Sequence, residues 1–208
     1  KTWKDTRSWK MPKITIPIKT KGLISTTRDD DKLGLFFTLG LDSFYTLEHH
    51  EKYLIEDKYP IDKLIFIQGF DIPLENHSLL NITLQNLIEV GRLMRKEVIL
   101  VSTNLKILSD PILSWESEHG AALASVGQLL SKQFRKIFIS SSDANIDNTP
   151  YGSNPYLDKS WSTETLEFFN YASNTQRYDK TALIVKNNLA KKFLRVCWEN
   201  KAPSPQSR

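Results

Sequence analysis

The amino-acid sequence predicts an α/β domain in which helices cover a parallel sheet. From Leu33 onward, short apolar runs of strand length alternate with amphipathic segments of helix length, and this alternation is typical of parallel sheets. The chain has 208 residues, which is enough for one domain. Its composition, 40% hydrophobic and 25% charged, is that of an ordinary folded protein.

Strands and helices can be placed in order from these patterns. Strands are expected at residues 33–38, 63–68, 97–102, 136–140 and 167–171. Helices are expected at residues 42–53, 79–94, 118–131 and 175–186, and an extended stretch at 193–198 closes the domain. We expect the first helix to bury Phe44, Leu47 and Leu54, and the second to turn Ile88 and its neighbours toward the sheet.

The chain divides into three parts. Residues 1–32 form an N-terminal extension with one candidate edge strand at 13–18, residues 33–200 form the domain, and residues 201–208 are expected to be a disordered tail. Within the domain, residues 141–160 lack an apolar period and are dense in turn-forming residues. So long a loop is either a lid that closes over a substrate or a mobile insertion.

Small polar residues and glycine follow four of the expected strands. They occur at residues 38–43, 69–71, 103–104 and 140–143. In open α/β sheets, ligands bind beyond the carboxyl ends of the strands, at the point where the strand order reverses. We therefore expect these turns, with Thr103, Ser140 and Ser141 among them, to converge on one ligand site.

The first of these turns is the best candidate for binding phosphate. A buried strand, a turn containing glycine and an Asp-Ser pair that opens a helix together direct backbone N–H groups and a helix N-terminus at one point. The hydroxyls of Thr38 and Ser43 and the N–H groups of residues 40–43 would donate to phosphate oxygens, with Asp42 as the helix N-cap. The alternative is an ordinary capped turn that binds no ligand.

This turn resembles the PP-loop of ATP pyrophosphatases, whose pattern is Ser-Gly-Gly-x-Asp-Ser after the first strand. The matching positions are Thr38, Leu39, Gly40, Leu41, Asp42 and Ser43. The chain departs from the pattern at Leu39, where the family has glycine. A leucine side chain would oppose a positive φ angle or crowd the phosphate. Weak binding, a shifted pose and a lost activity are each consistent with that departure.

Further segments extend the resemblance over residues 33–200 to a PP-loop-containing group. They are residues 64–73 (LIFIQGFDIP), 119–125 (HGAALAS) and 194–200 (LRVCWEN). The resemblance implies a HUP-type fold, a three-layer α/β/α domain with five mainly parallel strands in the order 3-2-1-4-5. It also implies ATP as cofactor and adenylation of a carboxylate or carbonyl oxygen with release of pyrophosphate. Gln68, Gly69 and Phe70 would then lie by the adenosine, unless Gly69 only turns the chain.

Several charged or ionisable residues complete the candidate site. His119 would contact phosphate or act as an acid or base, Arg177 and Lys180 would reach toward a triphosphate, and Asp71 would help to hold Mg²⁺ through a phosphate. With Asp42 and Ser43, the first three are the candidate catalytic residues, acting by positioning and charge neutralisation. For each of them a structural or solvent-exposed side chain is the alternative.

Two other functions stay open. One is a non-catalytic module that binds a nucleotide or a partner through a degenerate loop. The other is a tRNA-modifying PP-loop enzyme, because the net charge is +4 and much of the excess lies at the termini. The sequence holds no recognisable nucleic-acid-binding motif, which favours a solvated basic surface.

The sequence also favours a cytoplasmic setting without a membrane partner. No apolar run reaches the length of a membrane span. The first residues are charged rather than apolar, unlike a secretory leader. The single cysteine, Cys197, forms no internal disulfide.

Overall fold

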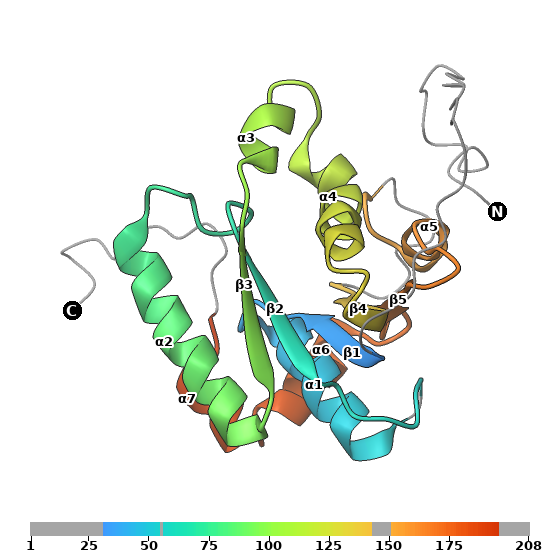
Figure 1. The fold of residues 1–208 in the computed structure, drawn as a ribbon. Helices are drawn as coiled ribbons and strands as arrows, with labels where there is room; N and C mark the ends of the chain where they lie inside the picture. The colour runs from blue at the N-terminus through green and yellow to red at the C-terminus, as the bar shows by residue number, and fades with distance from the viewer. Residues whose placement is uncertain (1–30, 55, 143–150, 196–208) are drawn as a thin grey trace.

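The computed structural model describes residues 31–54, 56–142 and 151–195, and these contain a five-stranded sheet (Figure 1). The strands are β1 (Lys32–Phe36), β2 (Lys63–Gln68), β3 (Glu97–Ser102), β4 (Phe134–Ser140) and β5 (Glu167–Tyr171). Their order across the sheet is β3-β2-β1-β4-β5. Every neighbouring pair is parallel. The predicted fold class and strand order are therefore confirmed.

Helices cover both faces of this sheet, which gives a three-layer α/β/α domain (Figure 1). The helices are α1 (Leu41–Tyr53), α2 (His77–Met94), α3 (Leu105–Ser109), α4 (Trp115–Leu129), α5 (Pro155–Ser160), α6 (Arg177–Ile184) and α7 (Asn188–Phe193). Helices α1, α2, α6 and α7 supply side chains to the core on one face, and α4 supplies the core on the other.

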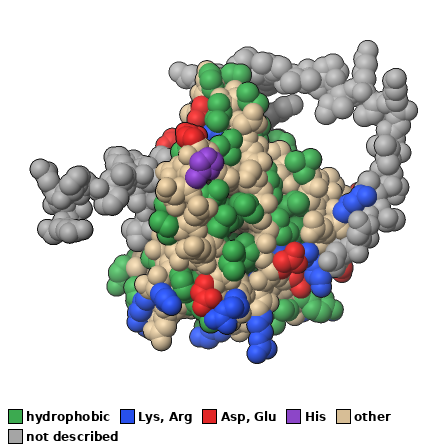
Figure 2. Space-filling model, turned by 60° about the vertical axis from the view of Figure 1, so that its left-hand side comes forward, with side chains coloured by type: hydrophobic (Ala, Val, Ile, Leu, Met, Phe, Trp, Pro, Cys, Tyr) green, Lys and Arg blue, Asp and Glu red, His purple; other side chains and the backbone are tan. Residues whose placement is uncertain are grey.

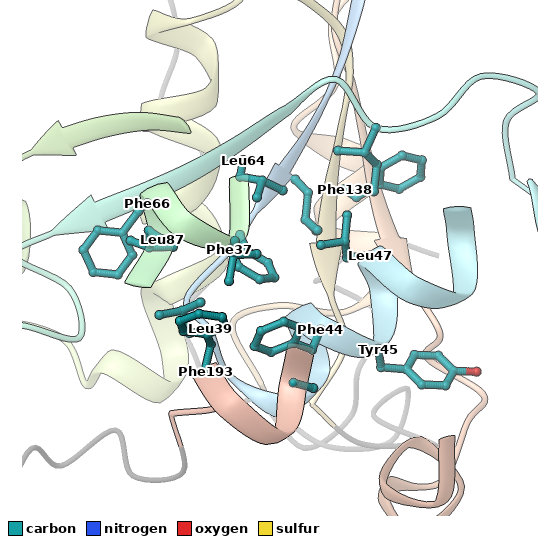
Figure 3. Close-up of a cluster of buried hydrophobic side chains, with 14 of the residues drawn as sticks. Phe37, Leu39, Phe44, Tyr45, Leu47, Leu64, Phe66, Leu87, Phe138 and Phe193 are labelled. Atoms are coloured by element: carbon teal, nitrogen blue, oxygen red, sulfur yellow. The ribbon is translucent and has the colours of Figure 1, made fainter. Parts of the chain in front are cut away.

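The two cores follow from the alternation of side chains along the central strands. Leu33 and Leu35 of β1 point into the α1 core, and Phe36 points into the α4 core. In the first core the rings of Phe37 and Phe44 pack edge to face with centroids 5.0 Å apart (Figure 3). A central strand that is apolar on both faces is the expected pattern for a parallel sheet between two helical layers.

The predicted elements agree with the structure except near their ends and in three short helices. Strands β2, β3 and β5 have the predicted bounds, β1 ends at Phe36 rather than at 38, and β4 begins at Phe134. The predicted extended stretch at 193–198 is wrong at its first residue, because Phe193 ends α7; its residues 196–198 lie outside the described residues. Helices α3, α5 and α7 were not predicted.

Local capping explains why helices form where turn chemistry dominates the sequence. The side chain of Asn154 accepts hydrogen bonds from the N–H groups of Tyr156 and Leu157, and Pro155 occupies the first helical position of α5. Asn187 caps α7 in the same way through the N–H of Ala190. Polar residues that read as a loop are therefore partly helix caps.

Two predicted inner-face residues point elsewhere. Leu54 is 38% exposed because it is the left-handed C-cap of α1, with φ at 49°, and Ile88 is 60% exposed on α2. Phe44 and Leu47 are fully buried as predicted. The candidate strand at 13–18 and the tail at 201–208 lie outside the described residues.

Candidate functional site

A cavity of about 650 Å³ lies beyond the carboxyl ends of β1, β2 and β4. The chain passes from β1 outward to β2 and β3, then returns to place β4 on the other side of β1, so the strand order reverses between β1 and β4. Ligands of open α/β sheets bind at such a point. The volume falls within the range of small-molecule sites, about 300–1,000 Å³.

One end of the cavity is the turn between β1 and α1. Thr38, Gly40, Leu41, Asp42 and Ser43 all line it. The Ser43 hydroxyl donates to the carbonyl of Gly40 over 3.0 Å, which ties the turn to the first helical turn. This bond fixes a compact strand–turn–helix, and the N-terminus of its helix borders the cavity.

Gly40, and not Asp42, is the N-cap of α1. Asp42 is the second residue of the helix, so its predicted capping role is wrong. Gly40 has no side chain that could satisfy the first N–H groups of α1, and these groups have no partner within the helix itself. The uncapped end therefore suits an external anion.

Leu39 adopts the conformation that its side chain was expected to oppose. Its φ angle is 61°, in the left-handed region, and its side chain is 1% exposed. Figure 3 shows it among the buried side chains of the α1 core, where Phe37 and Phe193 also lie. Leu39 does not line the cavity, so it leaves the turn open at a cost of about 1–2 kcal/mol in backbone strain.

Lys180 supports this turn from beneath rather than lining the cavity. Its side chain is 1% exposed, and its ammonium donates to the carbonyl of Ser141 over 2.6 Å. It also forms an ion pair with Asp42 over 3.4 Å. Burial raises the pKa of Asp42, whereas the charges of Lys180 and Arg177 lower it. Lys180 thus links α6, the end of β4 and α1.

Two arginines bring positive charge to the cavity. Arg177, at the start of α6, lines it, and it forms no ion pair with any other described residue. Arg195 also lines it, and sequence reasoning gave it no role. Its guanidinium donates to Asp71 over 2.6 Å and to the carbonyl of Thr38 over 3.3 Å. A single arginine after a helix resembles a solvated charge in sequence, and only the fold brings it to the ends of β1 and β2.

The other end of the cavity is aromatic and apolar. Phe70 and Trp115 pack with ring centroids 4.9 Å apart, and His119 packs against Tyr151 with centroids 4.6 Å apart. All four side chains line the cavity, together with Phe36, Ile65, Ile67 and Ile139 from the sheet. This half offers flat, hydrophobic surfaces to a ligand ring.

His119 is positioned as a hydrogen-bond acceptor. It lies in the second turn of α4 rather than at its start. Its Nδ1 lies 3.1 Å from the carbonyl of Trp115, and because a carbonyl only accepts, Nδ1 carries the hydrogen. Burial lowers the pKa of His119, so the ring is neutral near pH 7 and Nε2 is the bare nitrogen.

Four of the predicted ligand-contact residues shape the strand ends without lining the cavity: Gln68, Gly69, Thr103 and Ser141. The Gln68 amide donates to the carbonyl of Leu74 and accepts from the Ser102 hydroxyl. Gly69 has a φ angle of 99°, and an added Cβ would lie 1.9 Å from the carbonyl oxygen of Thr103. The reading of Gly69 as a residue that turns the chain is thus the one that the geometry favours.

Ser140, Phe70 and Asp71 do line the cavity. The Ser140 hydroxyl accepts a hydrogen bond from Thr46 of α1 over 2.8 Å. Within the described ranges, no cluster of three or more His, Cys, Asp or Glu side chains could hold a metal ion. A metal at this site would therefore depend on ligand oxygens together with Asp42 or Asp71.

The predicted basic surface is described only in part. Lys191 and Lys192 on α7 are exposed, and Figure 2 shows Lys and Arg side chains along the lower edge of its face with acidic ones among them. The basic residues of 1–30 and 196–208 lie outside the described residues, so a nucleic-acid partner stays a prediction. None of the described helices is long and apolar enough to cross a membrane.

Comparisons of the chain with protein-family models, with curated proteins and with solved structures gave no match.

Proposed function

We propose that this chain binds ATP in the cavity and adenylates a carboxylate or carbonyl oxygen of an acceptor, with release of pyrophosphate. The observation that carries the proposal is one cavity with two unlike ends at the reversal of strand order. One end has an uncapped helix N-terminus and arginines, and the other has aromatic rings. A nucleotide has the same two parts, an anionic chain and a flat base.

The phosphate end supports binding of a polyphosphate. Backbone N–H groups at the start of α1 suit phosphate oxygens, and Arg177 adds a cation that forms no ion pair with the described residues. The buried Lys180 holds the turn in shape through Ser141 and Asp42. The resemblance of residues 38–43 to a PP-loop agrees with this placement.

The aromatic end supports binding of the base. Phe70 and Trp115 offer ring surfaces for stacking, and the bare Nε2 of neutral His119 would accept a hydrogen bond from an amino group. Tyr151 closes this end against His119. Adenine carries an exocyclic amino group that can donate to such an acceptor.

In this proposal, catalysis rests on positioning of the reactants and neutralisation of the phosphate charge. An acceptor oxygen attacks the α-phosphorus, the bond to the bridging oxygen of the β-phosphate breaks, and pyrophosphate leaves. Mg²⁺ held by the phosphates, with Asp71 or Asp42, would neutralise charge on the leaving group. The α1 N–H groups and Arg177 would stabilise charge that develops on the phosphate oxygens.

A non-catalytic nucleotide-binding module is the alternative, and one contact favours it. Arg195 holds Asp71 over 2.6 Å, so the carboxylate that would serve the metal already has a strong partner. Exchange of labelled pyrophosphate into ATP, measured with a panel of carboxylic acids, separates the two functions. Exchange above the acceptor-free background supports adenylation; ATP binding without exchange for any acid supports the module.

Binding itself is tested by calorimetry with Mg²⁺·ATP and with AMP. We expect Arg177→Gln to weaken ATP binding at least about tenfold and AMP binding less, because a charge-assisted hydrogen bond contributes about 1.5–3 kcal/mol. Trp115→Ala should weaken both ligands alike, since both carry the base.

The matched control is Arg92→Gln on α2. Arg92 is exposed, pairs with Glu89 and does not line the cavity, so its removal should leave both affinities unchanged. Absence of any heat at millimolar ATP, or equal losses in the Arg177 and Arg92 variants, would refute the proposed site.

A further inference from the structure

Asp158 of α5 is a carboxyl group buried beside the cavity wall. Its side chain is 0% exposed. One oxygen, Oδ2, accepts from the hydroxyl of Ser153 and from the amide Nδ2 of Asn170, both over 2.7 Å. Asn170 lies on β5, so this oxygen joins α5 to the edge of the sheet.

The second oxygen of the Asp158 carboxyl group and the oxygen of the Asn170 amide have no hydrogen-bond partner among the described residues. Asp158 Oδ1 and Asn170 Oδ1 are both buried and accept no hydrogen bond from any described residue. Neither atom can donate while Asp158 is ionised. Leaving two buried acceptors unsatisfied costs about 1–3 kcal/mol each, so a group that satisfies both at once is favoured.

A proton on Asp158 Oδ1, donated to Asn170 Oδ1, would satisfy both atoms together. A carboxylic acid and a primary amide form two parallel hydrogen bonds, one in each direction. The first, from Asn170 Nδ2 to Asp158 Oδ2, is already in place, and the second would run from the protonated Oδ1 to Asn170 Oδ1. The two oxygens without a partner are therefore the two that lose their shared hydrogen bond when the proton is absent.

We propose that Asp158 takes up a proton in the folded protein and forms an acid–amide pair with Asn170. This pair positions residues 151–153, which place Tyr151 in the wall of the cavity. Ser153, bonded to Asp158, is two residues after Tyr151. The intervening Gly152 donates its N–H to the carbonyl of Glu116 on α4 over 2.7 Å. Tyr151 then packs on His119.

The wall is packed too tightly to shift independently of α4. An added Cβ on Gly120 would lie 2.1 Å from the carbonyl oxygen of Gly152 and 3.0 Å from Asp158 Oδ1. Figure 1 shows α5 beside α4 and β5, in agreement with these contacts. Movement of Asp158 is therefore transmitted to Gly152 and Tyr151.

Asp158 forms no ion pair with any described side chain. Charged side chains on the packed elements are Glu116 and Glu118 on α4, Glu167 on β5 and Lys159 on α5. None is a cause of its shift: burial raises the pKa of Asp158 to about 6, against hydrogen bonds from Asn170, Ser153 and the Asn154 backbone that lower it. Because the folded pKa is raised above the ordinary value, the proton stabilises the fold at low pH, and this contribution is lost as the pH rises through about 6.

The pair is tested directly by titrating the Asp side-chain carboxyl carbons by NMR, with Asp158→Asn to assign the signal. We expect Asp158 to titrate near pH 6. The folding equilibrium constant should fall about fiftyfold between pH 4 and pH 6.5, since the proton that Asp158 holds in the folded protein is lost over this range. Asp158→Asn should remove this dependence, because its amide donates to Asn170 as the protonated acid does.

A control variant and two contrary outcomes complete the test of the acid–amide pair. Asp110→Asn, at an exposed aspartate after α3, should leave the pH dependence intact. An Asp158 that titrates below about pH 4, or an Asp158→Asn protein less stable than the parent at pH 5, would overturn the pair. These readouts need no ligand, so they stand even where the proposed ATP binding fails.

The positioning role is tested by hydrogen exchange at Gly152 and through α5. Corrected for the intrinsic rate, exchange in the parent should slow as the pH falls through 6, and in Asp158→Asn it should be slow throughout. Equal pH dependence in both proteins would refute the role. The consequence for ATP, an affinity that depends on pH in the parent and not in Asp158→Asn, rests on the proposed function.

Discussion

Leu39 and Gly69 follow neighbouring strands and both have positive φ angles, 61° and 99°. Glycine has no Cβ and adopts this conformation at little cost, whereas leucine gives up about 1–2 kcal/mol. Leu39 is retained there by burial: its side chain is 1% exposed in the α1 core. The same residue thus strains the turn and anchors it.

Substitution of Leu39 separates these two effects. Leu39→Ala and Leu39→Gly should both lower the free energy of unfolding by about 2–5 kcal/mol, because each leaves a cavity. The glycine variant should be the more stable of the two by about 1 kcal/mol, since only glycine relieves the strain. Chemical denaturation measures both differences.

Leu47 is the matched control for that order. It is fully buried in the interior of α1, where glycine is less favourable than alanine by about 1 kcal/mol. The alanine variant should therefore be the more stable one at Leu47. The same order at both positions would contradict the strain assigned to Leu39.

Among the elements, α4 shows most clearly what sequence patterns can predict. Small residues let a helix pack closely on a sheet, and the structure places Gly127 of α4 against the ring of Phe168 on β5. Strands with long apolar runs were predicted at the right places for the same reason, since their pattern is strong over several residues. Helices of five or six residues, such as α3 and α5, hold too few periods to be recognised.

Gly127→Ala should destabilise the protein although alanine favours helices. The added Cβ would lie 2.4 Å from the Phe168 ring and 3.2 Å from Ile137, and overpacking of this kind costs about 1–3 kcal/mol. Helix propensity returns about 1 kcal/mol, so a net loss is expected in thermal unfolding. Ser125→Ala, at an exposed position of the same helix, should change stability by less than about 0.5 kcal/mol.

On the scale of the whole molecule, ion pairs join distant parts of the chain at the amino ends of the strands. Asp57, between α1 and β2, accepts two hydrogen bonds from Arg135 of β4, both over 2.7 Å. Lys136 lies within 3.6 Å of the same carboxylate. The Arg135 guanidinium, against a smaller effect of burial, lowers the pKa of Asp57 to about 2.

The ion pair between Asp57 and Arg135 makes the free energy of unfolding depend on pH at the acidic end. Because the folded pKa of Asp57 lies below its ordinary value of 3.8, its contribution is present above pH 4 and is lost as the pH falls toward 2. Asp57→Asn should lower the free energy of unfolding by about 2 kcal/mol at pH 7. The difference should vanish near pH 2.

Glu89→Gln provides the comparison in the same titration. Its partner Arg92 is three residues away on an exposed helix face, and such pairs contribute little to stability. Unchanged stability is expected at every pH. A loss of stability at Glu89 equal to that at Asp57 would contradict the larger contribution assigned to the partly buried pair of Asp57 and Arg135.

The sequence by itself determined the sheet, its parallel strands and the polar strand ends, because each of these depends on a local pattern of apolar, small and turn-forming residues. The turn between β1 and α1 belongs to this group. Tertiary structure decided which strand-end residues line the cavity: Phe70 and Ser140 do, while Gln68 and Thr103 do not. It also brought Arg195 to the cavity and turned Leu39 into the core. These outcomes depend on the direction of side chains packed across the sheet, and no local pattern records that direction.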